Sequence, residues 1–312
     1  MPRMKAVCID SFGGPEVLRL AEVERPQPRE DEVLIRVHAA SVNPVDYKIR
    51  SGQYSRVSAD PLPKILGRDI AGVVEDCGRE VTSWKPGDEV YAMLEPQSGG
   101  YAEYACVKQS LCAPKPRQLD FTFAAAVPLA GLTAWQGEFD HGQLRAGQRE
   151  LIHGGAGGVG HLAIQFAKAR GASVATTVAR ADMDFVRSLG ADQAIDYRAD
   201  SFERELTDMD LVFDLVGGET QERSWSVLKE GGALISTLKQ PSESRARERR
   251  VRAEHYMAQP DGAELRQIGE LIDAGQVRPH VLAIYPLEDA AEAQRRLESD
   301  HVRGKIVLEL IP

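Results

Sequence analysis

Hydrophobic positions in the first third of the chain fall into short runs that alternate with polar residues and are separated by Gly, Pro and Asp. The runs cover residues 4–9, 17–24, 32–40, 70–77, 88–93 and 101–107. Short runs of this kind, bounded by turn-forming residues, are typical of β-strands. The pattern therefore predicts an all-β, barrel-like domain up to about Ala113.

A different pattern begins at about Phe123, where helical stretches alternate with short apolar strands. The predicted strands are residues 150–153, 173–178, 193–196, 211–216 and 232–237. Strands and helices in alternation indicate a parallel sheet that helices cover on both faces. Farther on, a predicted helix near residues 263–274 is followed by strand-like runs at 281–285 and 305–310.

The strand-like runs at the end indicate that the last 50 or so residues rejoin the first domain. We expect an α/β protein in which residues 1–122 and 262–312 form a β-barrel domain, interrupted by a doubly wound domain of residues 123–261. The length agrees, because 312 residues exceed the usual roughly 100–200 residues of one domain. A crevice between two such domains is the natural place for a ligand.

The composition of the chain argues against a membrane-spanning protein and against a nucleic-acid-binding protein. A hydrophobic fraction of 43% and a charged fraction of 27% are ordinary for a folded globular chain, and no apolar run is long enough for a membrane span. The net charge of -9 argues against broad contact with nucleic acid or an anionic membrane. The segment from Met1 to Asp10 reads as the start of a strand and not as a secretory signal, so we expect a cytoplasmic protein.

Two local features need separate interpretation. Residues 241–252 carry five Arg against two Glu, and this basic segment either faces an anionic cofactor or is a solvated loop. The four cysteines are scattered, with no C-x-x-C pair and no nearby His at ligand spacing. Buried free thiols account for them, and we expect no metal site.

Gly154, Gly157 and Gly160 are spaced as G-x-x-G-x-x-G between a predicted strand and an amphipathic helix. A glycine turn in this context lets the backbone approach a pyrophosphate, whose charge is favoured at the helix N-terminus. Gly158 and Val159 belong to the same turn. We interpret the segment as a dinucleotide-binding site, and a tight turn that binds nothing is the alternative.

The residues that follow the predicted strand at 173–178 decide which dinucleotide is expected. NAD sites place an acidic residue there for the ribose 2′-hydroxyl, whereas an Arg accommodates the 2′-phosphate of NADP. Here Arg180 follows the strand, and Asp182 lies two positions on. A guanidinium paired with a phosphate is worth roughly 1.5–3 kcal/mol, so NADPH is favoured. The alternatives are Arg180 as a surface residue and Asp182 as a ribose ligand.

Several segments together resemble the zinc-independent quinone oxidoreductase branch of the medium-chain dehydrogenase/reductase family. They are HAASVNPVDYKIRSG, LGRDIAGVV, AAAVPLAGLTAW, the glycine turn, RSLGADQAIDY, DLVGG, GGALIS and RGKIVL. The resemblance implies a GroES-like β-barrel domain interrupted by a Rossmann domain. It also implies NADPH-dependent reduction of a quinone, enal or enone, and a homodimer as the assembly.

The chain differs from the zinc-dependent alcohol dehydrogenases of the wider family at the positions of their zinc ligands. Those enzymes use a Cys about where Asn43 stands and Gly-His-Glu where this chain has Gly67, Arg68 and Asp69. An amide and a guanidinium cannot replace a thiolate and an imidazole on zinc. We therefore expect hydride transfer without a metal. Asp69, in an apolar stretch, needs hydrogen-bond partners and is expected to hold the domain together.

Four candidate catalytic residues lie on one segment: Asn43, Asp46, Lys48 and Tyr54. The resemblance puts Asn43 and Asp46 beside the nicotinamide and the substrate, where Asn43 could donate to the developing oxyanion. The alternatives are a turn at Asn43-Pro44 and a helix cap at Asp46. Lys48 and Tyr54 could supply a cation or a phenol to the substrate oxygen, or be exposed side chains.

Further cofactor contacts are carried over from the resemblance. Thr133 is expected near the nicotinamide, Tyr197 near the adenosine phosphate, and Val216 and Gly217 along the cofactor's edge. A packed aromatic at a strand end is the alternative for Tyr197. His153, just before the glycines, is expected to be a strand-end residue that transfers no proton.

Two rival functions use the same residues. An enoyl-thioester reductase of the same superfamily would need a basic patch for its carrier, and the Arg-rich residues 245–252 are the candidate. A non-catalytic NADPH-binding sensor, or an RNA-associated protein, is the rival from a different class. The acidic net charge weakens the RNA version.

Overall fold

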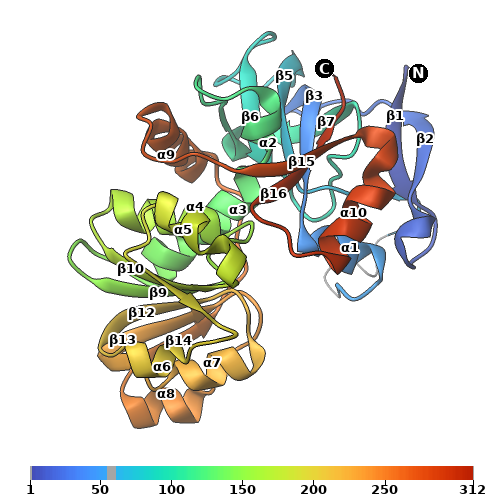
Figure 1. Ribbon diagram of the computed structural model, residues 1–312. Coiled ribbons are helices and arrows are strands. Elements are labelled where there is room, and N and C mark those ends of the chain that lie inside the picture. The colour runs from blue at the N-terminus through green and yellow to red at the C-terminus, as the bar shows by residue number, and fades with distance from the viewer. Residues whose placement is uncertain (1, 55–60, 312) are drawn as a thin grey trace. The chain divides into compact units, whose positions relative to one another are not determined.

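The structure, a computed structural model, describes residues 2–54 and 61–311, and its contacts divide the chain into two units. The first unit consists of Met1–Leu129, Pro260–Asp273 and Pro279–Pro312, and the second of Ala130–Gln259 and Ala274–Arg278. In Figure 1 the first unit carries both ends of the colour bar, blue and red. The chain therefore leaves a first domain, builds a second one and returns.

The first unit is a β domain of two sheets. The larger sheet contains β3 (Glu32–Val42), β5 (Asp69–Cys77), β6 (Glu89–Met93), β7 (Tyr104–Lys108), β8 (Cys112–Pro114), β15 (Val281–Pro286) and β16 (Lys305–Glu309). Its strand order is β15-β16-β3-β5-β6-β8, and β7 also pairs with β3. The smaller sheet contains β1 (Arg3–Ile9), β2 (Arg19–Glu24) and β4 (Lys64–Ile65), in the order β2-β1-β4.

The C-terminal strand β16 is an integral part of this domain. It pairs antiparallel with β3, so that Ile306 lies opposite Val42, and both side chains are buried in the core. The helices of this unit are η1 (Pro15–Val17), α1 (Pro44–Arg50), η2 (Gln109–Leu111), α2 (Phe121–Ala125), α9 (Gly262–Asp273), η5 (Leu287–Asp289) and α10 (Ala290–Ser299). A further helix, α3 (Pro128–Trp135), begins where the first unit ends.

The unit boundaries differ from the predicted ones by a few residues. The first unit runs past Thr122 to Leu129, because α2 packs on β3 and β5. On the return, residues 274–278 stay with the second unit. Gln165 holds them there, because its side chain exchanges hydrogen bonds of 3.1 and 2.8 Å with the backbone of Arg278.

The second unit is built on a six-stranded parallel sheet. Its strands are β9 (Arg149–His153), β10 (Ser173–Val178), β11 (Gln193–Asp196), β12 (Met209–Asp214), β13 (Leu228–Ser236) and β14 (Arg252–His255). The order is β11-β10-β9-β12-β13-β14, and all neighbours run parallel. Numbered along the chain, this is 3-2-1-4-5-6, the order of a Rossmann domain. The predicted fold class, a β domain interrupted by a doubly wound α/β domain, is confirmed.

The helix η3 (Gln136–His141, a π-helical turn) precedes these strands. The helices that connect them are α4 (Gly160–Ala169), η4 (Arg180–Asp182), α5 (Met183–Ser188), α6 (Phe202–Glu205), α7 (Gly218–Ser224) and α8 (Glu243–Arg249). The basic segment is not a loop, because residues 243–249 form α8, which Ser242 caps, and β14 follows, but its arginines are exposed, as the solvated alternative expected. Within the described residues, no helix is both long and apolar enough to cross a bilayer.

Candidate active site

The glycine turn connects β9 to α4 in the second unit. Gly154 has a φ of +79°, in the left-handed region that favours glycine. A Cβ on Gly160 would lie 2.3 Å from the carbonyl oxygen of Gly154, so α4 can approach the start of the turn only without a side chain there. Gly157, Gly158 and Val159 lie between these points and lead into the N-terminus of α4. The turn is therefore tight and leads directly into the N-terminus of α4, where an anion is favoured.

A second turn follows β12, the neighbour of β9 at the point where the strand order reverses. Asp214 ends β12 and is fully buried. Its carboxylate accepts the backbone N–H groups of Val216 at 3.1 Å and Gly217 at 2.7 Å, and the hydroxyl of Ser236 at 2.9 Å. These bonds end the strand at Asp214, earlier than the predicted residue 216. In open α/β sheets, ligands bind outside the carboxyl ends of the strands at such a reversal.

Exposed side chains lie at the same edge of the sheet. Arg180 follows β10 and is exposed, and its side chain makes no hydrogen bond or ion pair with any residue that the structure describes. Tyr197 follows β11 and is 51% exposed, and its hydroxyl accepts a hydrogen bond from Arg198 Nε at 3.2 Å. Val216 is 50% exposed, whereas Asp182, the alternative ribose ligand, is 2% exposed. This edge of the sheet therefore exposes the unpaired guanidinium of Arg180, whereas the carboxyl group of Asp182 is buried.

His153 and Thr133, also in the second unit, are buried. The ring of His153 lies 2.9 Å from the hydroxyl of Thr177 through Nδ1 and 2.9 Å from that of Ser224 through Nε2. Burial lowers the pKa of His153 to about 4, so the ring is neutral at physiological pH. With both nitrogens engaged, His153 is a structural residue at the end of β9. The carbonyl oxygen of Thr133, on α3, accepts a hydrogen bond from the hydroxyl of Tyr256.

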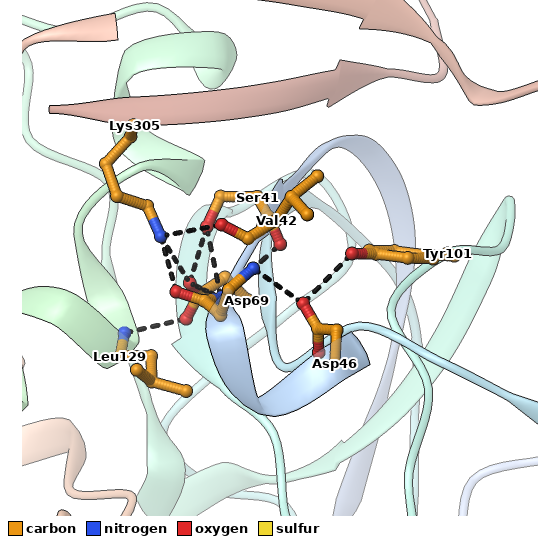
Figure 2. A network of polar contacts seen from close by, with 8 residues as sticks. Ser41, Val42, Asp46, Asp69, Tyr101, Leu129 and Lys305 are labelled. Atoms are coloured by element: carbon orange, nitrogen blue, oxygen red, sulfur yellow. Dashed lines mark hydrogen bonds and ion pairs between the residues drawn. The ribbon is translucent and has the colours of Figure 1, made fainter. Parts of the chain in front are cut away.

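A network of buried polar groups lies in the first unit, where β3 ends and α1 begins (Figure 2). The backbone N–H of Asn43, which precedes α1, donates to Asp46 Oδ2 at 2.7 Å, and the hydroxyl of Tyr101 donates to the same oxygen at 2.9 Å. Asp46 Oδ1 has no hydrogen-bond partner among the described residues. Burial raises the pKa of Asp46 to about 7, although both donors favour the carboxylate. Burial and hydrogen bonding thus act in opposite directions on the pKa of Asp46.

Asp69, the first residue of β5, connects this network to neighbouring elements. Its Oδ2 accepts hydrogen bonds from the hydroxyl of Ser41 at 2.5 Å and the side-chain amide of Asn43 at 2.7 Å. Its Oδ1 accepts the backbone N–H of Leu129 at 2.7 Å. Lys305, at the start of β16, donates to Asn43 Oδ1, and its Nζ lies 4.0 Å from Asp69 Oδ2. These contacts agree with the expectation that Asp69 holds the domain together.

The four predicted catalytic residues differ in what they can reach. The side-chain amide of Asn43 is directed at Asp69 and is 1% exposed, so in this geometry it has little capacity to donate to a substrate oxyanion. Asp46 is fully buried. Lys48, on α1, and Tyr54 are half-buried, and Tyr54 shares a hydrogen bond with Arg68. Lys48 and Tyr54 are thus the more accessible pair.

Two residues of these clusters were missed by the sequence analysis. Lys305 is 4% exposed, and its signal was a lysine at the first position of the apolar run KIVLEL. Asp214 is fully buried, and its signal was an acid inside the apolar run LVFDLV. An ionisable side chain in an apolar strand needs partners, which is the argument that singled out Asp69.

The residues at the positions where zinc-dependent relatives carry their ligands make other contacts in this structure. Arg68 is 4% exposed and donates through Nε to the carbonyl oxygen of Leu94 at 2.7 Å. A guanidinium and the amide of Asn43 offer zinc neither a thiolate nor an imidazole. Within residues 2–54 and 61–311, no three His, Cys, Asp or Glu side chains gather into a possible metal site.

The arginines of the basic segment are mostly paired. Arg245 forms an ion pair with Glu222 at 3.1 Å, and Arg250 forms one with Glu230 at 3.0 Å. Arg252 donates to the carbonyl oxygens of residues 141 and 142. The segment therefore has fewer cations available for a carrier than its composition indicates.

Two family models match the chain. Residues 29–117 match the alcohol dehydrogenase GroES-like domain, and residues 189–308 match the model described as zinc-binding dehydrogenase. Among curated relatives, the chain is 38% identical over 321 residues to the chloroplastic NADPH-dependent alkenal/one oxidoreductase of Arabidopsis thaliana, covering 99% of this chain and 80% of the relative. It is 33% identical over 327 residues to the quinone oxidoreductase of Mus musculus, covering 98% of both chains.

Solved structures give the same result. The quinone oxidoreductase from Coxiella burnetii has a TM-score of 0.92 and 37% identity, covering 99% of this chain and 100% of that one. The Escherichia coli quinone oxidoreductase complexed with NADPH has a TM-score of 0.89 and 29% identity, covering 98% and 100%. The chain therefore belongs to the quinone oxidoreductase branch of the medium-chain dehydrogenase/reductase family.

Proposed function

We propose that this protein is an NADPH-dependent reductase of quinones or α,β-unsaturated carbonyl compounds that transfers hydride directly, without a metal. The observation that carries the proposal is a glycine turn at the N-terminus of α4 with the unpaired side chain of Arg180 at the same sheet edge. The relatives named as alkenal/one and quinone oxidoreductases support the substrate class. Bound NADPH would supply the hydride from C4 of its nicotinamide.

Residues of the second unit fit this cofactor. The backbone from Gly157 to Gly160 would receive the pyrophosphate, because the glycines carry no side chain that would hold a phosphate away and the N-terminus of α4 favours an anion. Arg180 would pair with the 2′-phosphate, whose oxygens match the donors of a guanidinium. The remaining candidates along the cofactor are Thr133, Tyr197, Val216 and Gly217.

Side chains of the first unit would orient the electrophile and handle the proton. Asp46 holds a proton in part of the molecules near neutral pH, because burial raises its pKa to about 7, and Oδ1 is its unpartnered oxygen among the described residues. Tyr101 and the backbone N–H of Asn43 fix the other oxygen of this carboxyl group. Lys48 and Tyr54, which are less buried, are the candidates for contact with the substrate oxygen.

We further propose a cytoplasmic homodimer with no nucleic acid or membrane as a partner. Strand β14 ends the six-stranded sheet and could pair with a second copy through its outer edge. Cys8, Cys77, Cys106 and Cys112 are free thiols, which suits a reducing compartment. The net charge of -9 disfavours binding to polyanions.

The test is consumption of NADPH, followed by absorbance, with a panel of 1,4-quinones, 2-alkenals and acyl-CoA thioesters. We expect turnover with a quinone or an alkenal that persists in the presence of a chelator. No turnover with any compound would contradict the reductase and favour an NADPH-binding sensor. Turnover confined to thioesters would favour the enoyl-thioester reductase, and stoichiometric zinc with chelator-sensitive activity would contradict the metal-free step.

A further inference from the structure

Lys305 carries a buried ammonium group at the start of β16. The residue is 4% exposed, and Nζ donates to the carbonyl oxygen of Val42 at 3.1 Å and to Asn43 Oδ1 (Figure 2). Asp69 Oδ2 lies 4.0 Å from Nζ. A buried ammonium is costly unless it is paired and hydrogen-bonded, and these contacts offset that cost for Lys305.

Lys305 contacts two side chains that hold the starts of helices, Asn43 before α1 and Asp69 at α3. Through Asn43 Oδ1 it holds the residue that precedes α1, whose backbone N–H in turn holds Asp46. Lys305 also faces the carboxylate of Asp69, and this carboxylate accepts the backbone N–H of Leu129 in the first turn of α3. The same helix carries Thr133. One ammonium thus acts on the starts of two helices.

We propose that Lys305 is a positioning residue of the reductase: its charge balances the carboxylate of Asp69 and fixes the carboxamide of Asn43, so that the starts of α1 and α3 keep one geometry. The proposal rests on the proposed function. It assigns Lys305 no contact with the substrate, because Nζ is enclosed by Val42, Asn43 and Asp69.

The charge balance explains why a lysine is used here. Asp69 and Asp46 are the acidic groups that act on Lys305, and both favour its charged form against the burial that lowers its pKa. Arg68 faces the same two carboxyl groups, with Tyr54 beside it, and Tyr101 faces Asp46. Without the ammonium, Asp69 would keep its neutral donors but lose the cation nearest to Oδ2, and Asn43 Oδ1 would lose its donor.

The experiment compares Lys305→Met, Lys305→Arg, Asp69→Asn and the double variant Lys305→Met/Asp69→Asn. Methionine keeps an unbranched apolar stem while removing the charge, and asparagine keeps the shape of aspartate. Lys108→Met is the matched control, because Lys108 is a lysine of the same unit whose side chain is 42% exposed and pairs with Glu95 at 3.0 Å. For each variant we would measure the thermal midpoint, the dissociation constant of NADPH, and kcat and KM across pH.

We expect Lys305→Met to lower the thermal midpoint by about 5 °C or more, because one partner of a buried pair is lost. We expect kcat to fall about tenfold or more through misplacement, with the dissociation constant of NADPH within about twofold of the wild type. Lys305→Arg should recover most of kcat, and the double variant should be more stable than either single variant. Lys108→Met should change none of these quantities.

Three results would overturn the proposal. A kcat of Lys305→Met equal to that of the wild type would remove the positioning role. A large loss of NADPH affinity would make Lys305 a cofactor ligand instead. A double variant that is less stable than both single variants would show that Lys305 and Asp69 act independently. If the wild type reduces no electrophile, the proposed function fails, and the thermal comparison alone still decides whether Lys305 holds Asp69.

Discussion

Buried carboxyl groups have opposite surroundings in the two units. In the first unit, Asp69 accepts three hydrogen bonds of 2.5–2.7 Å, and the ammonium of Lys305 lies 4.0 Å away. In the second unit, Glu138 of η3 and Glu150 of β9 are fully buried, and none of their four carboxyl oxygens has a hydrogen-bond partner among the described residues. Burial raises the pKa of both glutamates well above the usual range, and the charge of Glu150 adds to the effect on Glu138.

The difference shows what decides the charge of a buried acid. Transfer out of water disfavours a carboxylate, and only donors or a cation can replace the lost hydration. Asp69 has both, whereas Glu138 and Glu150 have neither among the described residues. Asp69 is thus a hydrogen-bonded structural acid, whereas burial favours the neutral form of the two glutamates.

The largest effect is expected for Asp69→Ala. The substitution leaves the ammonium of Lys305 without its nearest carboxylate and the N–H of Leu129 without its acceptor. Breaking a buried pair in this way costs about 3–5 kcal/mol of the free energy of unfolding, which urea denaturation would measure. The control is Glu95→Ala, which removes an exposed partner of Lys108 and should cost roughly 0–1 kcal/mol. Equal losses in the two variants would contradict the role of Asp69.

Glu138→Gln should flatten the dependence of stability on pH. Because the folded-state pKa of Glu138 is raised, its contribution to stability is complete below the unfolded-state pKa, about 4.3, and is lost as the pH rises. One such group contributes a loss of about 1.4 kcal/mol per pH unit above that value. The variant should lose correspondingly less stability as the pH rises from the unfolded-state pKa toward the raised folded-state pKa.

Urea denaturation at a series of pH values would measure these slopes. Glu230→Gln serves as the control, because Glu230 is an exposed glutamate of the same unit that pairs with Arg250. If Glu138→Gln and the wild type had the same slope, Glu138 would be ionised in the folded protein, and the contrast with Asp69 would disappear.

The comparison also shows which parts of the molecule could be predicted from the sequence. Strands and helices follow from local hydrophobic patterns, so the two-domain fold was predicted, with errors where a side chain ends an element, as Asp214 does for β12. The partners of buried charges are set by tertiary contacts: Lys305 reaches Asn43 across 262 positions. Glu138 lies in the polar stretch QGEFDH, where nothing local indicates burial. The roles of the candidate site residues stay predictions.

Arg180 is a charged group of a different kind, because its guanidinium is exposed and has no hydrogen-bond or ion-pair partner among the described residues. If it pairs with the 2′-phosphate, Arg180→Ala should weaken NADPH binding about 10 to 100-fold, equivalent to roughly 1.5–3 kcal/mol, and leave NADH binding nearly unchanged. Titration calorimetry with both cofactors would measure the two dissociation constants. Arg187→Ala is the control, because Arg187 is an exposed arginine that pairs with Asp184 at 3.2 Å. An equal loss for NADH and NADPH would remove Arg180 from the 2′-phosphate.

The smallest effect is expected for Arg245, a cation of the basic segment that already has a partner. Its ion pair with Glu222 measures 3.1 Å, and the two side chains are 48% and 49% exposed. Because such exposed pairs contribute roughly 0–1 kcal/mol, Arg245→Ala should barely change the free energy of unfolding or the dissociation constants of NADPH and acyl-CoA thioesters. A large loss of affinity for either ligand would mean that the pair opens to bind phosphate. An ion pair seen in the structure would then not show that a cation is structural, because the cation would exchange its partner for a ligand.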